Sequence, residues 1–309
     1  MSGGVAVVVP TLGTSELLTE SLAALRAQGA PLRLIVVCPS REVLPAAAAA
    51  DQVVETGAAA GFAAATNAGF AAAGPADWLG TVNDDVVVAP DWLERLLDAA
   101  RAHTAAAALQ GVNVALDRPE VADGCGLAWN RWLQAVQIGR HQPAPSPAGA
   151  VREIFGVSAT AALYRRDALE SVALRGGDVF DSLFDSYYED VDLAVRLRSH
   201  ERISMLAPAA RARHAGSATL ARQPARRARL VYGNRLLTLR RALGRGFWRE
   251  LLLLWASDFR DTLRAAGRGE LPTAFGMAGG WLRAAARAGR LSPLARPLAA
   301  AELRRWSDT

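Results

Sequence analysis

The apolar run from Val5 to Val9 constrains the fold most strongly. It has none of the polar alternation of a strand with one solvated face, so it predicts a strand that is buried on both sides. Such strands belong to parallel sheets that carry helices on both faces. Similar runs predict further strands over residues 32–38, 52–55, 78–82 and 105–114.

Helical patterns separate these runs. Leu18, Leu22 and Leu25 form one apolar stripe, and residues 58–73 and 91–102 predict two further helices. The alternation predicts an open, mostly parallel α/β sheet flanked by helices. For the later chain we expect an irregular excursion, a strand, a helix, a short strand and a polar loop at residues 121–149, 155–164, 166–172, 203–207 and 211–217, respectively.

Polar residues follow two of the predicted strands. Pro10 and Thr11 end the first, and Asn83-Asp84-Asp85 follows the strand over 78–82. Open α/β sheets bind ligands at the carboxyl ends of their strands, and adjacent carboxylates suit Mg²⁺ or Mn²⁺ on a diphosphate. A β-turn without a metal is the alternative. No G-x-G-x-x-G follows the first strand, which argues against NAD or FAD.

The stretch 184–198 places carboxylates at the start of a short amphipathic helix. Asp192 and Arg196 are spaced as an i,i+4 pair. Glu189 and Asp190 lie where the helix dipole favours negative charge, and a carboxylate held there is a candidate general base. The alternative is an acidic first turn that only stabilises the helix.

Two weaker signals remain. Residues 61–70 combine glycine, alanine and Asn67 at a predicted helix start, which permits a ligand to approach the backbone or the helix to pack tightly. His214 lies beside arginines in the predicted polar loop. A lone histidine of this kind is either structural or a ligand that returns to the same pocket.

Taken in order, these segments resemble the family 2 glycosyltransferases, in the rhamnosyltransferase-like branch. The resemblance covers roughly residues 5–245. It is carried by Val7-Val8-Val9-Pro10-Thr11, Gly61-Phe62 with Asn67-Ala68-Gly69, Asn83-Asp84-Asp85, Leu163-Tyr164-Arg165-Arg166, the E-D-x-D-L-x-x-R-L segment at 189–197, His214 with Ser217, and Tyr232-Gly233-Asn234-Arg235.

The resemblance implies a GT-A fold and a metal-dependent, inverting transfer from a nucleotide-diphospho-sugar. It makes Asp85 the ligand of Mg²⁺ or Mn²⁺, with Asp84 on metal or ribose and His214 as a further ligand. Asp190 becomes the base, with Glu189 as second choice. Pro10, Thr11, Ser40, Phe62 and Asn67 are expected near the nucleotide, and Arg165 near the diphosphate.

The turn Cys38-Pro39-Ser40-Arg41 lacks the acid that the family commonly has there. The choice between a UDP-linked and a dTDP-linked donor, dTDP-rhamnose included, therefore stays open. The acceptor that the resemblance leads us to expect is a lipid-linked or cell-surface glycan, or a soluble natural product. A non-catalytic module that binds sugar nucleotides is a further alternative.

Charge divides the chain. Residues 201–309 carry 21 Arg against 7 acids, whereas residues 1–200 carry 14 Arg against 23 acids. We expect a catalytic domain over 1–222 and a helical region over 223–309. Trp248, Leu251, Leu252, Trp255, Phe259 and Leu263 recur there at helical spacing. That stripe packs on the catalytic domain, on a second copy in a homodimer, or on a membrane surface.

Other classes of protein are less consistent with the sequence. The basic region lacks a recognisable nucleic-acid-binding module. Cys38 and Cys125 have neither metal spacing nor a disulfide framework. We see no secretory signal and no apolar run that could span a bilayer, so we expect a cytoplasmic protein, with peripheral contact at the inner face of the membrane as an option.

Overall fold

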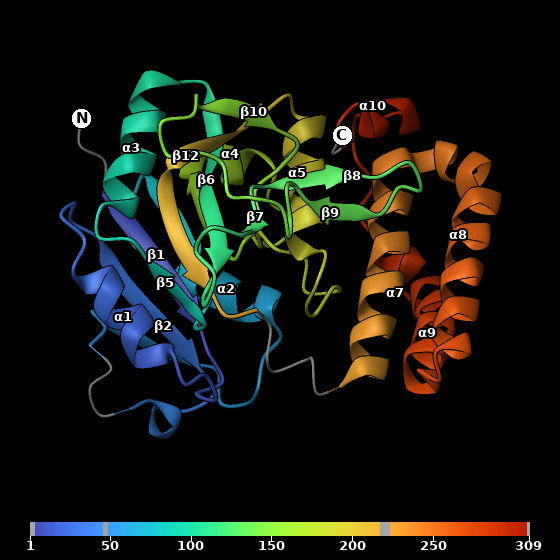
Figure 1. Ribbon diagram of the computed structural model, residues 1–309, viewed down its shortest axis with the longest axis horizontal. Helices are drawn as coiled ribbons and strands as arrows, with labels where there is room; N and C mark the ends of the chain where they lie inside the picture. The colour runs from blue at the N-terminus through green and yellow to red at the C-terminus, as the bar shows by residue number, and fades with distance from the viewer. Residues whose placement is uncertain (1–3, 46–48, 217–222, 308–309) are drawn as a thin grey trace.

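A computed structural model describes residues 4–45, 49–216 and 223–307. A large sheet with helices on both faces forms one part of the molecule, and a bundle of helices forms the other (Figure 1). The strands are β1 (Val5–Pro10), β2 (Arg33–Cys38), β3 (Gln52–Glu55), β4 (Trp78–Val82), β5 (Val86–Val88), β6 (Ala106–Ala115), β7 (Ala122–Gly124), β8 (Leu127–Trp129), β9 (Ala135–Gln137), β10 (Arg152–Ile154), β11 (Ala161–Arg165) and β12 (Ile203–His214).

The helices are α1 (Leu18–Arg26), α2 (Phe62–Ala71), α3 (Trp92–Ala102), α4 (Arg166–Ser171), α5 (Glu189–Ser199), α7 (Pro224–Leu243), α8 (Phe247–Gly267), α9 (Leu271–Arg287) and α10 (Ala300–Arg304), with the short 3₁₀ turns η1 (Arg41–Val43), η2 (Gly244–Gly246) and η3 (Ala288–Arg290). None of the helices in the described ranges is long and apolar enough to cross a membrane.

The sheet has the strand order β10-β12-β6-β11-β4-β1-β2-β3. β1 is parallel to both neighbours, so that Val8 lies between Ile35 of β2 and Thr81 of β4. β11 is antiparallel to β4 and β6, and therefore begins at the edge where the parallel strands end. The predicted fold class, an open, mostly parallel α/β sheet flanked by helices and followed by a C-terminal helical region, is confirmed.

Both faces of β1 are buried, as its sequence predicts. Val5, Val7 and Val9 pack in one cluster with apolar side chains of α1 and α3. Ala6 and Val8 pack in a second cluster, on the other face, with side chains of α2, α4 and α5. The sheet is thus a rigid middle layer that fixes where its strand ends lie.

Several local predictions are wrong. Residues 155–160 are not part of a strand, because side chains take their backbone donors: Ser158 N donates to Gln110 Oε1 and Ala159 N to Asp190 Oδ2. Residues 211–214 are not a loop but the end of β12, paired with β5 and β6. The excursion after residue 121 contains the hairpin β8–β9. Ser217 lies outside the described residues.

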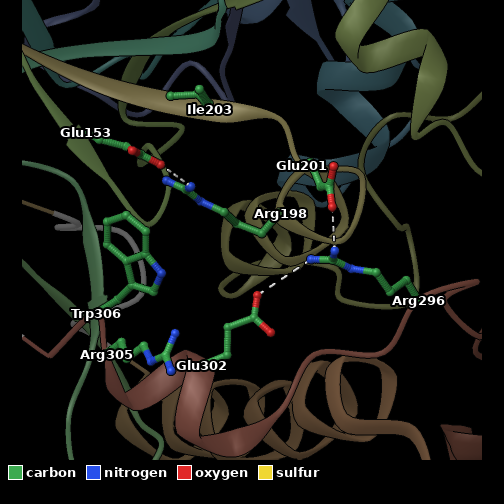
Figure 2. A pocket seen from close by; sticks show the side chains of 8 residues that line it. All are labelled: Glu153, Arg198, Glu201, Ile203, Arg296, Glu302, Arg305 and Trp306. Atoms are coloured by element: carbon green, nitrogen blue, oxygen red, sulfur yellow. Dashed lines mark hydrogen bonds and ion pairs between the residues drawn. The ribbon is translucent and has the colours of Figure 1, made fainter.

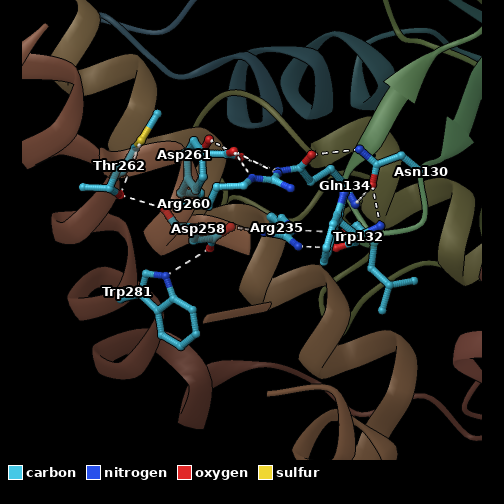
Figure 3. Close-up of polar contacts among 12 residues, drawn as sticks. Asn130, Trp132, Gln134, Arg235, Asp258, Arg260, Asp261, Thr262 and Trp281 are labelled. Carbon is cyan, nitrogen blue, oxygen red and sulfur yellow. Dashed lines mark hydrogen bonds and ion pairs between the residues drawn. The ribbon is translucent and has the colours of Figure 1, made fainter. Parts of the chain in front are cut away.

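The C-terminal helices continue the core of the sheet domain. Leu236, Leu239 and Leu254 share a buried cluster with Trp129 of the hairpin and Val195 of α5. A buried polar network crosses the same contact (Figure 3). The inner faces of helices α7, α8 and α9 therefore pack on the sheet domain.

Arg235 lies in the middle of that network. Its guanidinium donates to the carbonyls of Trp132 and Leu133 and forms an ion pair with Asp258 of α8. Trp281 Nε1 donates to the other oxygen of Asp258 at 3.0 Å (Figure 3). Both charges are almost fully buried, so each depends on the other for compensation.

We predict that Asp258→Ala lowers the free energy of unfolding by about 3–5 kcal/mol, because it leaves the Arg235 charge buried without a partner. Denaturant unfolding of the full chain measures this. Asp98→Ala, which breaks the exposed pair with Arg101, is the control and should change stability little. Equal, small effects of the two substitutions would show that the buried pair does not hold the helices in place.

Candidate functional site

The ends of β1 and β4 meet as predicted. Thr11 donates its hydroxyl to Asp84 Oδ2 at 2.5 Å, and Ser15 donates to the Asp84 carbonyl at 2.9 Å. Burial raises the pKa of the Asp84 carboxyl, although the Thr11 hydrogen bond opposes this. These contacts fix Asp84 against the loop after β1 and leave the neighbouring Asp85 to face another element.

Asp85 faces the end of β12. Its Oδ1 lies 3.4 Å from His214 Nε2, and its carbonyl accepts from Ala215 N. The other ring nitrogen of His214 pairs with Asp123 Oδ2 at 2.6 Å. Burial lowers the pKa of His214, but the hydrogen bond to Asp123 and the nearby carboxylate of Asp85 outweigh it and raise this pKa to about 9. The predicted pair Asp85 and His214 is thus brought together.

Asp123, on β7, was missed in the sequence. Burial would raise its pKa, but the hydrogen bond with His214 and the charge of Arg140 lower it below the usual range. In metal sites, a carboxylate that binds the second ring nitrogen of a ligating histidine orients the imidazole. Asp123 has this position beside His214. No local signal in Ala122-Asp123-Gly124 reveals this, because the contact spans 91 residues of sequence.

The side chains present suit a divalent cation. His214 Nε2 is buried, has no hydrogen-bond partner, and is too far from Asp85 for an ordinary hydrogen bond. Within the described ranges, no three His, Cys, Asp or Glu side chains form a ready-made metal cluster. Two protein ligands with open positions are what Mg²⁺ or Mn²⁺ uses when a diphosphate completes the shell.

Asp190 reaches the same edge of the sheet. Its Oδ1 accepts from Val191 N at 2.8 Å and its Oδ2 from Ala159 N at 3.3 Å. Ala159 directly precedes Thr160, whose carbonyl accepts from Asn83 N. A short chain of hydrogen bonds therefore joins the start of α5 to the Asp84–Asp85 turn.

Burial is the main influence on the pKa values of Glu189 and Asp190, the two acids at the start of α5. It raises the pKa of Asp190, although backbone N–H groups and Ser158 oppose the shift. It raises the pKa of Glu189 well above the usual range, and the nearby Asp190 charge adds to this. Glu189 Oε2 is buried without a hydrogen-bond partner, whereas Asp190 keeps partial exposure.

Asp192 has a different environment from these two. The predicted pair with Arg196 is present and buried, and Arg241 of α7 binds the other oxygen of Asp192. Among the residues that the structure describes, neither Glu189 nor Asp190 has a cationic partner. The acidic stretch thus contains two acids that pair with arginine, Asp192 and Asp185, and two acids whose charge is not compensated.

The segment before α5 has an unusual backbone. Asp185, Tyr187 and Tyr188 all have left-handed φ angles of 66° to 69°, which cost of order 1–3 kcal/mol each for residues other than glycine. Gly61 lies against this segment, because a Cβ there would be 2.1 Å from Asp185 Oδ1. The glycine thus makes room for this loop rather than for a ligand.

Asn234 of α7 holds the strained segment. Its Nδ2 contacts the carbonyls of Phe184, Ser186 and Tyr187 at 2.7–3.0 Å. Arg283 of α9 donates to Asn234 Oδ1 and so fixes the orientation of the amide. The Asn-Arg pair of α7 therefore has two roles, since Asn234 holds the loop before Asp190 while Arg235 ties α7 to α8.

The structure also locates the other predicted contacts. Ser40 follows β2 at the expected edge and caps η1 by accepting from Glu42 N. The ring of Phe62 packs edge-on against Phe180, with centroids 5.8 Å apart. The Asn67 amide binds the backbone of Val179 and Phe180, so the protein itself accounts for this asparagine without a nucleoside.

Arg165 is not brought to the site. It pairs in the sheet with Trp78, at the amino end of β4, whereas Asp84 and Asp85 follow the carboxyl end. Its guanidinium binds Asp167 and the Thr104 carbonyl. The expectation that Arg165 faces a diphosphate is therefore corrected, because β11 runs antiparallel and carries its last residue to the opposite edge.

A separate cavity of about 440 Å³ lies between the sheet domain and α10 (Figure 2). Five of its charged side chains pair with one another: Arg198 with Glu153, and Arg296 with Glu201 and Glu302. Arg198 also stacks over Trp306. None of the predicted site residues lines it, and we assign it no role in binding.

Residues 3–233 match the family described as "Glycosyltransferase like family 2". The chain belongs to this glycosyltransferase family. Its last helices extend beyond the matched region. A search of curated proteins finds no match.

Solved structures share the fold at low sequence identity. The mannosyltransferase PcManGT of Pyrobaculum calidifontis, in complex with GDP-Man and Mn²⁺, is 18% identical with a TM-score of 0.54, over 93% of this chain and 87% of that one. GalNAc-T7 with UDP, GalNAc and Mn²⁺ is 11% identical, with a TM-score of 0.58. TarS of S. aureus is 15% identical, with a TM-score of 0.50.

The matches to GalNAc-T7 and TarS include less than half of each of those proteins. Each comparison covers 77% of this chain, but 48% of GalNAc-T7 and 40% of TarS. The chain thus spans about half the length of those proteins or less, and the likeness concerns the fold of the shared part.

We predict that Asn234→Ala speeds amide hydrogen exchange in residues 184–191, because the carbonyls of Ser186 and Tyr187 in the strained segment lose their donor, at a cost of about 1–3 kcal/mol. Thr238→Val is the control, since it removes a buried hydroxyl without a partner one turn along the same helix. Unchanged protection in Asn234→Ala would show that the loop holds its conformation without α7.

Proposed function

We propose that this glycosyltransferase moves a sugar from a nucleotide-diphospho-sugar to an acceptor hydroxyl by a metal-dependent, inverting single displacement. The observation that carries the proposal is that one sheet edge holds both the Asp84–Asp85 turn and the unpaired carboxylate of Asp190. The hydrogen bonds through Ala159 and Thr160 fix their separation.

Asp85 and His214 hold a Mg²⁺ or Mn²⁺ ion in this proposal, with Asp123 orienting the imidazole. The cation, when bound, neutralises charge on the departing nucleoside diphosphate. Asp84 faces the ribose or the metal, and Thr11 fixes its carboxylate. Pro10 and Ser40 line the nucleotide side of the edge, where β1 and β2 end.

Asp190 acts as the base in this proposal. It accepts the proton of the acceptor hydroxyl while the oxygen attacks the anomeric carbon from the side opposite the diphosphate, which inverts the configuration. Its raised pKa suits the task, because a base is most effective when its pKa approaches the working pH. Glu189 is the second choice, since its burial favours the neutral acid.

The donor is proposed to be UDP- or dTDP-linked, with dTDP-rhamnose as one option. The similar structures contain UDP in one case and GDP-Man in another, so all three nucleotides belong in the test. The acceptor is a lipid-linked or cell-surface glycan, or a soluble small molecule.

The test is thermal stability of the chain with UDP, dTDP or GDP, each with Mn²⁺, Mg²⁺ or EDTA. A ligand at about 100 times its dissociation constant stabilises a protein by about 2.7 kcal/mol, which raises the melting temperature by a few degrees. We expect one nucleotide to give such a shift with metal and to lose it with EDTA.

Asp85→Ala should abolish the metal-dependent part of that shift. Asp117→Ala is the control, because Asp117 is a strongly exposed acid just beyond β6, and it should behave like the unaltered chain. A shift that survives both EDTA and Asp85→Ala would contradict the proposed metal site. No shift with any of the nucleotides would contradict nucleotide binding by the free chain.

A further inference from the structure

Helix α8 has an apolar face that the protein leaves exposed. Its buried positions, among them Leu254 and Ala265, pack toward α7 and α9. A second apolar stripe lies on another side of the helix and remains 48–81% exposed. It consists of Trp248, Leu252, Trp255, Phe259 and Leu263, which we call the α8 stripe. The sequence left open whether the predicted stripe packs on the protein itself, on a second copy or on a membrane, and the structure leaves all of its members except Leu251 exposed.

The α8 stripe is continuous along the helix. Its members are spaced by three or four residues, so successive side chains are neighbours on the helix surface. Trp255 and Phe259 stack on each other with ring centroids 5.1 Å apart. At 1.5 Å per residue the stripe is roughly 22 Å long. Large exposed apolar patches of this kind mark surfaces that bind a protein or a membrane.

The charges around the stripe are positive. Arg245 and Arg249 are exposed, and in the described part of the chain neither has an ion-pair partner. Arg249 precedes Leu252 by three residues and so adjoins it. Every acid of α8 is already neutralised by an arginine: Glu250 by Arg304, Asp258 by Arg235 and Asp261 by Arg260. The free charge beside the stripe is therefore cationic, and an anionic partner complements it.

The positive charge beside the α8 stripe favours one of its two candidate partners, a second copy of the chain or a membrane. In a two-fold dimer the same patch of both copies meets, and because every acid of α8 is already paired, the α8 helix of the second copy offers these arginines no free carboxylate. A bilayer with anionic headgroups accepts both features, because tryptophan lies readily at the interface and arginine binds the headgroups. Helix α8 lies at the end of the molecule away from β1 and α3, with nothing outside it (Figure 1).

We propose that the α8 stripe docks this protein on an anionic lipid surface, with the helix lying in the plane of the interface. Trp248, Trp255 and Phe259 enter the boundary between headgroups and acyl chains, while Arg245 and Arg249 contact the headgroup phosphates. The inference goes beyond the proposed transfer reaction and does not depend on it.

The experiment is flotation of the full chain with vesicles of phosphatidylcholine, either alone or with about one third phosphatidylglycerol to supply the anionic surface. No donor, metal or acceptor is added, so the outcome is independent of the proposed catalysis. We expect binding to the mixed vesicles only, and weaker binding at higher salt because the headgroup attraction is screened.

Three double variants test whether vesicle binding depends on the α8 stripe and its arginines or only on the positive charge of the whole protein. Trp255→Ser/Phe259→Ser should weaken vesicle binding about tenfold or more, because it removes the apolar part of the contact. Arg245→Gln/Arg249→Gln should weaken it as well. Arg152→Gln/Arg175→Gln, which removes two exposed arginines outside the helical bundle, should leave it unchanged. Circular dichroism confirms that each variant is folded.

Three results would overturn the proposal. One is an absence of binding to the mixed vesicles, and another is binding that the stripe variants do not reduce. The third is a dimer, measured by light scattering, that Trp255→Ser/Phe259→Ser converts to a monomer, because the stripe would then bind a second copy.

Discussion

The contact between Asp190 Oδ2 and the N–H group of Ala159 links the two halves of the site. It joins the start of α5 to the residues before β11, and Thr160 joins those residues to the turn after β4. Because β11 runs antiparallel to β4, its first residue meets the last residue of β4. One antiparallel strand in an otherwise parallel centre therefore brings the proposed base to the proposed metal ligands.

That contact depends on helices far along the chain. The three left-handed residues before α5 need external support, and Asn234 and Arg283 supply it from α7 and α9. Arg241 of α7 also neutralises Asp192 and Asp181. The helical region thus completes the site: its inner face orients α5, while its outer face carries the exposed α8 stripe.

The sequence predicted the elements whose signal is local. Spacing and side-chain type predicted strands β1 to β4, the helix start at Glu189 and the Asp192–Arg196 pair. It could not predict what depends on long-range contact, such as Asp123 behind His214 or the loop contacts of Asn234. The misplaced Arg165 has the same cause, because strand direction in a sheet is a tertiary property that single-chain patterns do not specify.

The measurement that tests the account most directly is release of nucleoside diphosphate from UDP-, dTDP- and GDP-sugars by the unaltered chain, Asp190→Asn and Glu189→Gln. We predict that Asp190→Asn loses turnover by about a hundredfold or more, as expected for removal of a general base, while its metal-dependent nucleotide binding persists. Glu189→Gln should retain more activity than Asp190→Asn. Near-normal turnover in Asp190→Asn would contradict the central claim that this carboxylate is the base.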